Sequence, residues 1–188
     1  LAASVSHEVR NPLTVSRGFI QLLLEKRGVP EQDSRFLKLA LEEIDRAHQI
    51  ITDYLAFAKP EGDRVIPLRI GEEIQYVSDV MLPYATIGKV TISLQCEGDG
   101  IVHGDRQKFR QCLVNLLKNG IEAMPQGGAL DILITNCEKH VKIIISDHGA
   151  GMTEEELSRI GTPYFTTKAQ GTGLGTMVAY SIVRAMRG

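Results

Sequence analysis

The sequence predicts an α+β protein in which a helical hairpin precedes a set of helices packed against one face of a mixed sheet. Three observations lead to this fold class. Apolar residues recur every three or four positions over residues 1–58, the spacing of amphipathic helices. The cluster Lys59-Pro60-Glu61-Gly62-Asp63 then interrupts the pattern. After it, strand-like and helix-like segments follow one another without strict βαβ alternation.

The first segment predicts two helices joined by a short loop. Helical spacing runs from residue 1 to about residue 27, where Gly28-Val29-Pro30 ends it. Ser34 is predicted as the N-cap of the second helix, whose apolar positions continue to Ala58. Each helix has more apolar surface than one neighbour can cover, so we expect two hairpins to form a four-helix bundle. The pattern therefore predicts a homodimer.

The rest of the chain predicts a mixed sheet with its helices. In order, we expect a helix over 70–82, strands over 90–94 and 101–103, a helix capped by Asp105 and ending near 124, paired strands over 130–135 and 141–146, a short helix from Thr153, a loop over 161–172 and a helix over 174–186. We divide the chain into a hairpin domain (1–60), a linker (61–67) and a second domain (68–188).

The composition excludes several classes of protein. A net charge of -2 without a basic face argues against nucleic-acid binding. The three cysteines are odd in number and far apart, which fits small buried thiols in a reducing compartment better than a disulfide framework, and the lack of a CxxC pair argues against structural zinc. No apolar stretch approaches about 20 residues, so no membrane span is predicted. Both ends of the chain fall in or just after helical patterns, and we expect a longer parent protein.

His7 lies in the string Ser6-His7-Glu8-Val9-Arg10-Asn11-Pro12. A neutral imidazole offers one nucleophilic nitrogen near pH 7, and the neighbouring Glu8 carboxylate can flank the ring. Asn11 follows one helical turn later on the same face, and Pro12 cannot donate to the preceding turn, which predicts a bend. The alternative is a solvent-exposed histidine on an amphipathic helix. A zinc-protease His-Glu-x-x-His motif is excluded, because position 11 is asparagine.

Asn115 and Asn119 are four residues apart on the long predicted helix and therefore share a face, with Lys118 and Glu122 alongside. Two stacked amides offer oxygen ligands to a hard cation such as Mg²⁺, which also keeps waters and substrate phosphates. The alternative is an ordinary solvated stripe of polar residues.

Asp147 ends the core-facing side of a predicted strand. A carboxylate in that position needs a hydrogen-bond partner, and an adenine exocyclic amine fits the requirement. Gly149 and Gly151 allow the backbone to turn closely past a ring. The alternative is an Asx turn at the end of the strand.

Gly171, Gly173 and Gly175 lead into the last predicted helix, whose first amides can receive phosphates. The spacing matches neither a Rossmann fingerprint nor a Walker A loop. The preceding polar segment, residues 163–168, is lid-like and places Lys168 to screen phosphate charge.

Taken in order, these segments resemble the motifs of the sensor histidine kinases of two-component signalling, whose ATP site is of the gyrase, heat-shock-chaperone and mismatch-repair ATPase type. The five matching segments are the phosphoacceptor box (7–12), the N box (115–123), the G1 box (147–151), the F box (163–168) and the G2 box (171–175). The amino-acid sequence of these motifs is similar to that of the sporulation kinases of endospore-forming bacilli. The resemblance implies a four-helix bundle followed by a GHKL-type (Bergerat) α/β-sandwich domain.

The resemblance also implies an ATP-dependent autokinase that passes phosphate to an aspartate of a response regulator. His7 would be phosphorylated, Glu8 would be its general base, and Asn11 would position water if the protein also dephosphorylates its partner. Asn119 would hold Mg²⁺ with Asn115 nearby, and Asp147 would read adenine. The further ATP-binding residues would be Lys118, Gly149, Gly151, Thr167, Lys168, Gly171, Thr172, Gly173, Leu174 and Gly175.

The implied partners are a second copy of the chain, a receiver domain and a small inhibitor protein that docks on the helical bundle, with no nucleic acid. The implied location is cytoplasmic, with any membrane anchor in an N-terminal sensor region of the parent. The input signal, the regulator and the choice between transfer within one subunit and across the dimer stay open.

The chain departs from the family pattern in three places. His148 stands where asparagine is usual, Gly120 replaces a more usual alanine, and the sequence stops before the strands that normally complete the sheet. Two other functions are alternatives. An ATPase that drives conformational change uses a glutamate base where this chain has Asn115, and a non-catalytic scaffold predicts damaged nucleotide motifs.

Overall fold

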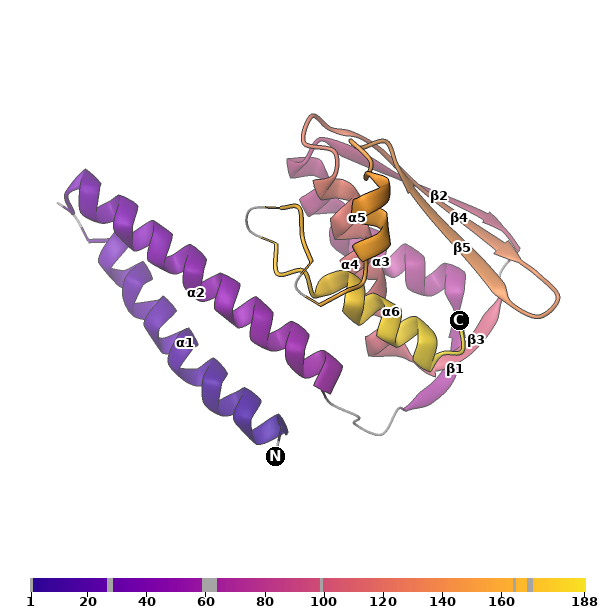
Figure 1. Ribbon diagram of the computed structural model, residues 1–188, viewed down its shortest axis with the longest axis horizontal. Coiled ribbons are helices and arrows are strands. Elements are labelled where there is room, and N and C mark those ends of the chain that lie inside the picture. The colour runs from indigo at the N-terminus through magenta and orange to yellow at the C-terminus, as the bar shows by residue number, and fades with distance from the viewer. Residues whose placement is uncertain (1, 27–28, 59–63, 99, 164, 169–170) are drawn as a thin grey trace. The chain divides into compact units, whose positions relative to one another are not determined.

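The computed structural model describes residues 2–26, 29–58, 64–98, 100–163, 165–168 and 171–188, without the side chains of 2–11, 48–50 and 52–58. The chain divides into two compact units, Leu1–Glu61 with Pro163–Leu174 and Gly62–Thr162 with Gly175–Gly188 (Figure 1). Each unit is described by itself below. Among the described helices, none has the length and apolar content needed to cross a bilayer.

The first unit contains the predicted helical hairpin. Helices α1 (Ala2–Leu24) and α2 (Glu31–Ala58) pack along each other. Arg17 on α1 donates from its Nε to Asp45 Oδ1 on α2 at 2.8 Å, so an ion pair accompanies the apolar contact. The helical hairpin is therefore confirmed.

The predicted N-cap of α2 is wrong by one turn. The helix begins at Glu31, and the backbone N–H of Ser34 already donates to the carbonyl of Pro30 at 2.9 Å. Proline is tolerated at a helix start because its missing N–H has no helical partner there. Glu31 and Asp33 fill the first turn, where the helix dipole favours negative charge. These local features outweigh the capping preference of Ser34.

The second unit alternates strands and helices. In chain order its elements are β1 (Val65–Arg69), α3 (Ile70–Ile87), β2 (Val90–Glu97), β3 (Ile101–Asp105), α4 (Arg106–Glu122), β4 (Gly128–Asn136), β5 (Val141–Asp147), α5 (Glu154–Arg159) and α6 (Gly175–Ala185). Strand β1 starts inside the segment predicted as a linker. The predicted domain boundaries themselves stay a prediction.

The sheet is mixed, as the sequence predicts. Its three strands have the order β2-β4-β5, with β2 parallel to β4 and β4 antiparallel to β5. A separate antiparallel pair joins β1 and β3. Helices α3 and α4 lie on one face of the three-stranded sheet, and α6 packs on α4 (Figure 1).

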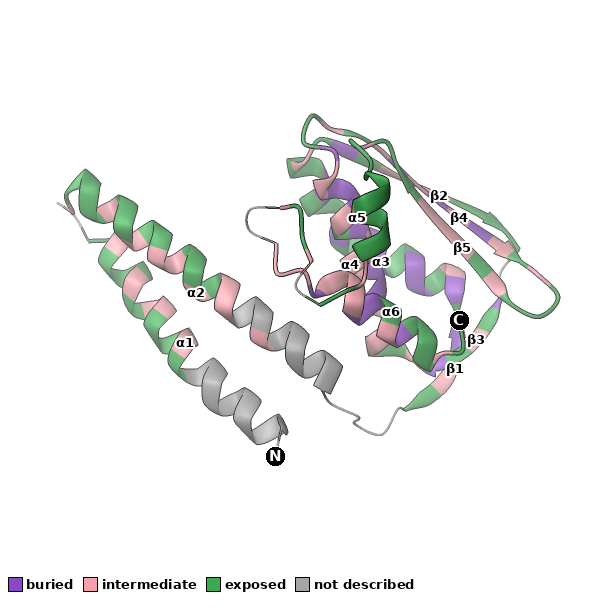
Figure 2. Ribbon diagram, viewed as in Figure 1, coloured by how far each residue is buried: buried purple, intermediate pink, exposed green. Residues whose placement is uncertain are grey.

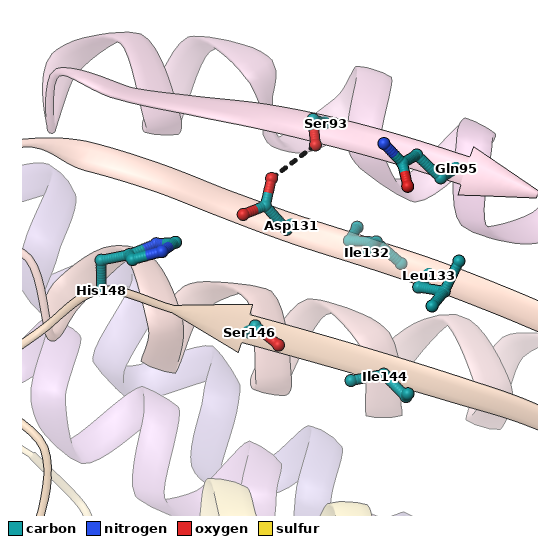
Figure 3. A pocket seen from close by; sticks show the side chains of 8 residues that line it. All are labelled: Ser93, Gln95, Asp131, Ile132, Leu133, Ile144, Ser146 and His148. Atoms are coloured by element: carbon teal, nitrogen blue, oxygen red, sulfur yellow. Dashed lines mark hydrogen bonds between the residues drawn. The ribbon is translucent and has the colours of Figure 1, made fainter.

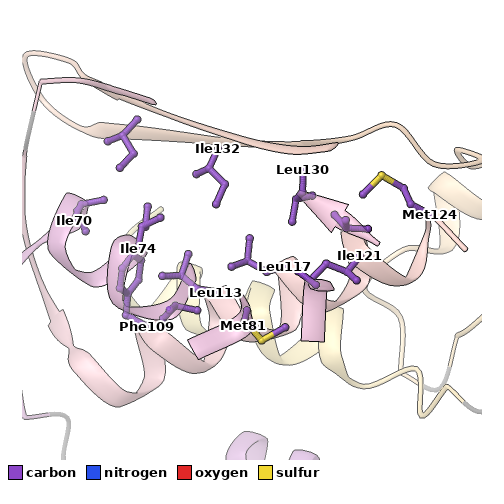
Figure 4. Close-up of a cluster of buried hydrophobic side chains, with 14 of the residues drawn as sticks. Ile70, Ile74, Met81, Phe109, Leu113, Leu117, Ile121, Met124, Leu130 and Ile132 are labelled. Carbon is purple, nitrogen blue, oxygen red and sulfur yellow. The ribbon is translucent and has the colours of Figure 1, made fainter. Parts of the chain in front are cut away.

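The core lies between the three-stranded sheet and helices α3 and α4 (Figure 4). Burial is concentrated on the facing sides of these elements (Figure 2). The core-facing residues of β5 pack against this cluster, as their alternation predicts. The most deeply buried side chains of the core are Leu68, Ile70, Ile74, Val77, Leu117, Leu130, Ile132 and Ile134.

A charged cluster fastens α3 to the first half of α4. Glu73 is 4% exposed, accepts a hydrogen bond from Arg110 Nε at 2.6 Å and forms an ion pair with Arg106, whose Nε lies 2.9 Å from Oε1. The guanidinium of Arg110 also lies 3.6 Å from the centre of the Tyr76 ring. A buried carboxylate is stable only when it is paired in this way. The cluster fixes the start of the helix that carries both asparagines.

Two helix starts are set by local capping. Asp105 Oδ1 accepts the backbone N–H groups of Gln107 and Lys108 at the start of α4, as predicted. Thr153 and Glu156 form a capping box at the start of α5.

Candidate nucleotide-binding site

The two asparagines of α4 both bind the start of α6. Asn115 Nδ2 donates to the carbonyl of Gly175, and Asn119 Nδ2 donates to Thr176 Oγ1, each at 3.2 Å. Because α6 holds each amide nitrogen, the amide oxygen of each side chain is directed away from that contact. Within the described residues, neither Oδ1 accepts a hydrogen bond. The two asparagines share one face of α4, as the spacing predicts, and the role of their oxygens as cation ligands stays a prediction.

Thr176 is a contact residue that the sequence analysis missed. It directly follows Gly175, so its place after the glycine motif is the only signal that points to it. Its role depends on the packing of α6 against α4, which brings together residues 57 positions apart.

Asp147 lies beside the second half of α4. A Cβ placed on Gly120 would lie 3.6 Å from Asp147 Cβ and 2.6 Å from Leu130 Cδ1. Glycine at position 120, where alanine is more usual, therefore fits the close approach of β4 and β5 to the helix. The structure brings Asp147 and the asparagine helix together within one unit, as predicted.

The loop after Asp147 passes tightly over the end of α4. The backbone N–H of Gly149 donates to Asp147 Oδ1 at 3.0 Å, which is the Asx turn foreseen as an alternative. A Cβ on Gly149 would lie 2.5 Å from the carbonyl oxygen of Ala123, so only glycine fits there. Gly151 has a φ of 71°, which glycine adopts without strain. The Asx turn occupies one carboxylate oxygen of Asp147, and the predicted contact with adenine, which would use the other oxygen, stays a prediction.

His148 points to the other side of the sheet. Its Nδ1 lies 3.1 Å from the carbonyl oxygen of Ala129, and the ring borders a shallow concavity on the face away from α4 (Figure 3). Ser93 donates to Asp131 Oδ1 at 2.6 Å in the same concavity. His148, which stands where asparagine is usual in the family, therefore lies on the face of the sheet opposite the helix that carries Asn115 and Asn119.

Glu122 ends the polar face of α4. Its Oε1 accepts a hydrogen bond from Tyr84 Oη on α3 at 2.7 Å and lies 3.8 Å from Lys118 Nζ. Burial, together with the hydrogen bond to Glu122 and its negative charge, raises the pKa of Tyr84 to about 12. Tyr84 is therefore a neutral donor at physiological pH. Lys118, predicted as an ATP-binding residue, is paired with Glu122.

The predicted lid residues belong to the first unit. The backbone N–H of Lys168 donates to Thr166 Oγ1 at 3.1 Å, and Gly171 N–H donates to the carbonyl of Lys168 at 3.1 Å. Thr172 Oγ1 accepts from the N–H of Leu174 at 3.3 Å, and Gly173 has a φ of 67°. Thr167 is exposed. These contacts define a locally folded loop, and its approach to phosphate stays a prediction.

The predicted phosphoacceptor residues lie on α1. His7, Glu8 and Asn11 are helical, and their side chains lie outside the described residues. Helix α1 continues through Pro12, which lies inside it. The bend predicted at this turn stays a prediction.

Comparison with known families matches both parts of the chain. Residues 1–63 match the His Kinase A (phospho-acceptor) domain, and residues 104–188 match the family described as histidine kinase-, DNA gyrase B- and HSP90-like ATPase. The chain belongs to the sensor histidine kinases. The family and fold class predicted from the motifs are confirmed, and so is an ATP-binding second domain.

The relatives of this histidine kinase include sporulation kinases. Sporulation kinase B of Bacillus subtilis (strain 168) is 42% identical over 190 residues, which cover all of this chain and 44% of the relative. Sporulation kinase A of the same organism is 37% identical, with 31% of its length covered. The chain therefore spans less than half of these relatives.

Solved structures of histidine kinases match nearly the full length of this chain. The histidine kinase ThkA, in complex with its response regulator protein TrrA, is 26% identical with a TM-score of 0.72, covering 99% of this chain and 54% of that one. Full-length ShkA in complex with AMPPNP is 24% identical with a TM-score of 0.76, covering 98% and 40%, a likeness of fold.

Proposed function

We propose that this protein is an ATP-dependent autokinase that phosphorylates His7 and passes the phosphoryl group to an aspartate of a response-regulator receiver domain. The observation that supports the proposal is that α6 holds the amide nitrogens of Asn115 and Asn119, and that the helix carrying these asparagines also lies beside Asp147. The family match of residues 1–63 to a phosphoacceptor domain supplies the acceptor.

ATP would bind between α4 and the G1 loop. The Asp147 carboxylate is proposed to accept a hydrogen bond from the adenine amine. Gly149 and Gly151 let the backbone pass close to the ring, which the tight approach of Gly149 to Ala123 supports. We propose that the phosphates are contacted by Lys118, Thr167, Lys168 and residues 171–175.

The donor set fits Mg²⁺. Amide oxygens are hard ligands, and Mg²⁺ takes most of its remaining ligands from water and phosphates. Within the described ranges, no group of three or more His, Cys, Asp or Glu residues forms a self-sufficient metal site. Asn119, with Asn115 beside it, would hold the ion, which neutralises phosphate charge and aligns the γ-phosphoryl group when bound.

The proposed transfer step joins the His7 acceptor to the ATP donor. A ring nitrogen of His7 attacks the γ-phosphorus, so an N–P bond forms while the bond to the β-phosphate oxygen breaks and ADP leaves with the electron pair. Glu8 accepts the proton from the other ring nitrogen as general base. Positioning and charge neutralisation supply most of the catalysis in such transfers.

The proposed partners follow from the same arrangement. A receiver domain would take the phosphoryl group, and Asn11 would position a hydrolytic water if the protein also dephosphorylates that receiver. The solved complex of ThkA with its response regulator supports a receiver partner. An inhibitor protein on the bundle and a membrane anchor in the parent are proposals that rest on the family resemblance alone.

The helical hairpin is proposed to dimerise. Several large apolar side chains of α1 and α2 are exposed, among them Phe19 at 63% and Phe36 at 62%. A second hairpin would cover them in a four-helix bundle. The other exposed apolar residues of the hairpin are Val15, Leu22, Leu23 and Leu39.

An ATPase that drives conformational change is the weaker candidate. That reaction needs a base to activate water, and an amide at position 115 is not one. Asn115 also has its nitrogen engaged with Gly175. The geometry therefore favours transfer to a nucleophile supplied by the other part of the chain.

Labelling with γ-labelled ATP tests the proposal. We expect a phosphoprotein that is labile in acid and stable in base, and no label in the His7→Gln variant. The matched control is His140→Gln, which changes an exposed histidine in the turn between β4 and β5 and should label normally. Retained labelling of His7→Gln would refute the assignment of the acceptor.

A further inference from the structure

The outer face of the three-stranded sheet, which lies away from α4, has a concavity in its middle. Its floor is one row of the strand register, in which Ser93 on β2 and Ser146 on β5 both lie opposite Asp131 on β4 (Figure 3). The side chains of this row are short, and the next row on the same face contributes the larger Leu133 and Ile144. The resulting hollow of about 410 Å³ is larger than a single water molecule requires.

Asp131 brings a negative charge to the middle strand without a cation to balance it. Its Oδ1 accepts a hydrogen bond from Ser93 at 2.6 Å, and its side chain is half-buried. Among the described residues, no lysine or arginine lines the concavity or pairs with this carboxylate. Aspartate is depleted from strands, and removing a carboxylate from water is costly unless it is paired. The concavity therefore favours a cationic ligand.

The polar neighbours of the carboxylate suit a ligand that only donates hydrogen bonds. The Ser146 hydroxyl and the Gln95 amide line the concavity, and within the described part of the chain neither has a hydrogen-bond partner. Both carry an acceptor oxygen, and an ammonium group has three donors and no acceptor. An arginine fork would compete with Ser93 for Oδ1, whereas an ammonium needs only one carboxylate oxygen. The site therefore fits a primary ammonium better than a guanidinium.

The apolar side of the concavity fits the stem of a lysine. Leu133 and Ile144 are half-buried and lie directly opposite each other on β4 and β5. Lysine lays its alkyl stem along apolar surface of this kind while its charged head stays at a polar group. Sites for free small molecules bury most of the ligand, which a shallow hollow on a sheet does not. A lysine held by a protein segment gains further contacts on the surrounding sheet.

We propose that this face of the sheet docks a protein partner through a lysine side chain, whose ammonium pairs with Asp131 and whose stem packs on Leu133 and Ile144. The proposal goes beyond the kinase reaction, because the concavity lies on the face of the sheet opposite the asparagine helix.

The test is an NMR titration of the isotope-labelled 188-residue chain with an acetylated and amidated pentapeptide that has one lysine at its centre, between threonine and valine residues. We expect the amide signals of Asp131, Leu133 and Ile144 to shift. Asp131→Asn keeps the size of the side chain and an acceptor for Ser93 and removes the charge. Its dissociation constant for the peptide should rise about tenfold, as for other hydrogen bonds to charged groups.

Glu97→Gln is the matched control. It removes an exposed carboxylate at the end of β2, on the same face by strand alternation and outside the concavity, and should bind the peptide as the parent does. If Asp131→Asn fails to fold, Ser146→Lys tests the same carboxylate. Ser146 is exposed and opposite Asp131, so the new ammonium would pair with the carboxylate and peptide binding should be lost.

Two further probes decide the chemistry and the source of the ligand. The peptide with norleucine in place of lysine should shift no signal, and equal binding of both peptides would overturn the charge pairing. Butylamine should bind more weakly than the lysine peptide, and equal or tighter binding would overturn a protein partner in favour of a free amine. Equal affinity of Asp131→Asn and Glu97→Gln for the lysine peptide, or no shift of any signal in the parent chain, would mean that Asp131 is simply hydrated.

Discussion

Asn119 donates its Nδ2 to Thr176 Oγ1 at 3.2 Å, and this bond joins the helix with the proposed cation ligand to the first turn of α6. The same helix is fixed at its other end by Glu73, which forms ion pairs with Arg106 and Arg110. The asparagine face is therefore positioned by contacts from two different helices, α3 and α6.

Replacing Thr176 by valine removes the hydroxyl with little change of shape. The Asn119 amide then loses the partner that orients it, which costs about 1 kcal/mol for a neutral hydrogen bond. We expect Mg²⁺-dependent ATP binding to weaken about fivefold, measured by calorimetry. Thr176→Ser keeps the hydroxyl and should restore binding. Equal loss in both variants would show that the methyl group, and not the hydroxyl, matters.

Features set by local chemistry are the ones that the sequence predicts well. Asp105 caps α4 because its carboxylate needs only the next three residues. The stacking of Asn115 and Asn119 follows from helical spacing alone. The pairing of β4 with β5 follows from two alternating runs and a short turn.

Features that depend on tertiary packing are the ones that escape prediction. The partners of Glu73 lie 33 and 37 positions away, and Thr176 lies 57 positions from Asn119. The side of the sheet that His148 faces depends on the strand register, which pairs Asp147 with Leu130. The start of α2 escaped for a different reason, because two local signals competed and Pro30 outweighed Ser34.

Gly149→Ala tests the tight turn of the G1 loop. The added methyl would meet the Ala123 carbonyl oxygen at 2.5 Å, so the loop or the end of α4 must shift. We expect the free energy of unfolding to fall by about 2 kcal/mol, as for other overpacked sites, and ATP binding to be lost. Urea unfolding measures the first. Gly18→Ala is the control, since no neighbouring group lies within 4 Å of the position that the added methyl would take, and it should leave ATP binding unchanged.

Glu73→Ala tests the charged cluster between α3 and α4. It leaves two arginines without their buried partner, and because these arginines are partly exposed we expect a loss of about 2–3 kcal/mol in urea unfolding, near the low end for a broken buried pair. Glu72→Ala removes an exposed carboxylate 3.8 Å from Arg69 and should cost about 0–0.5 kcal/mol. Similar losses in the two variants would contradict a stabilising role for burial.

Phe19→Glu tests the proposed dimer. It places a charge on the exposed apolar face of α1, where a second hairpin is expected to pack. Sedimentation should show a shift from dimer to monomer at micromolar concentration. Gln32→Glu adds the same charge at an exposed position in the first turn of α2 and should stay dimeric. A monomeric protein before any substitution would rule out this mode of assembly.

The buried thiol of Cys112 should make the free energy of unfolding fall at alkaline pH. Its thiol is 2% exposed, its Sγ lies 3.7 Å from the carbonyl oxygen of Ala179, and burial raises its pKa from 9.0 to about 11. The unfolded chain therefore releases this proton near pH 9, and the folded chain holds it until about pH 11. Because the unfolded state binds fewer protons in that window, stability falls as pH rises through it.

Cys112→Ala isolates this contribution. The variant should be less stable than the parent near pH 7, because it leaves a small cavity, and should lose less stability between pH 9 and pH 11. Urea unfolding across that range measures the difference. Cys96 is exposed and supplies the comparison: Cys96→Ala should keep the full alkaline loss. Parallel pH profiles for the parent and Cys112→Ala would mean that the thiol between α4 and α6 ionises as freely in the folded protein as in the unfolded chain.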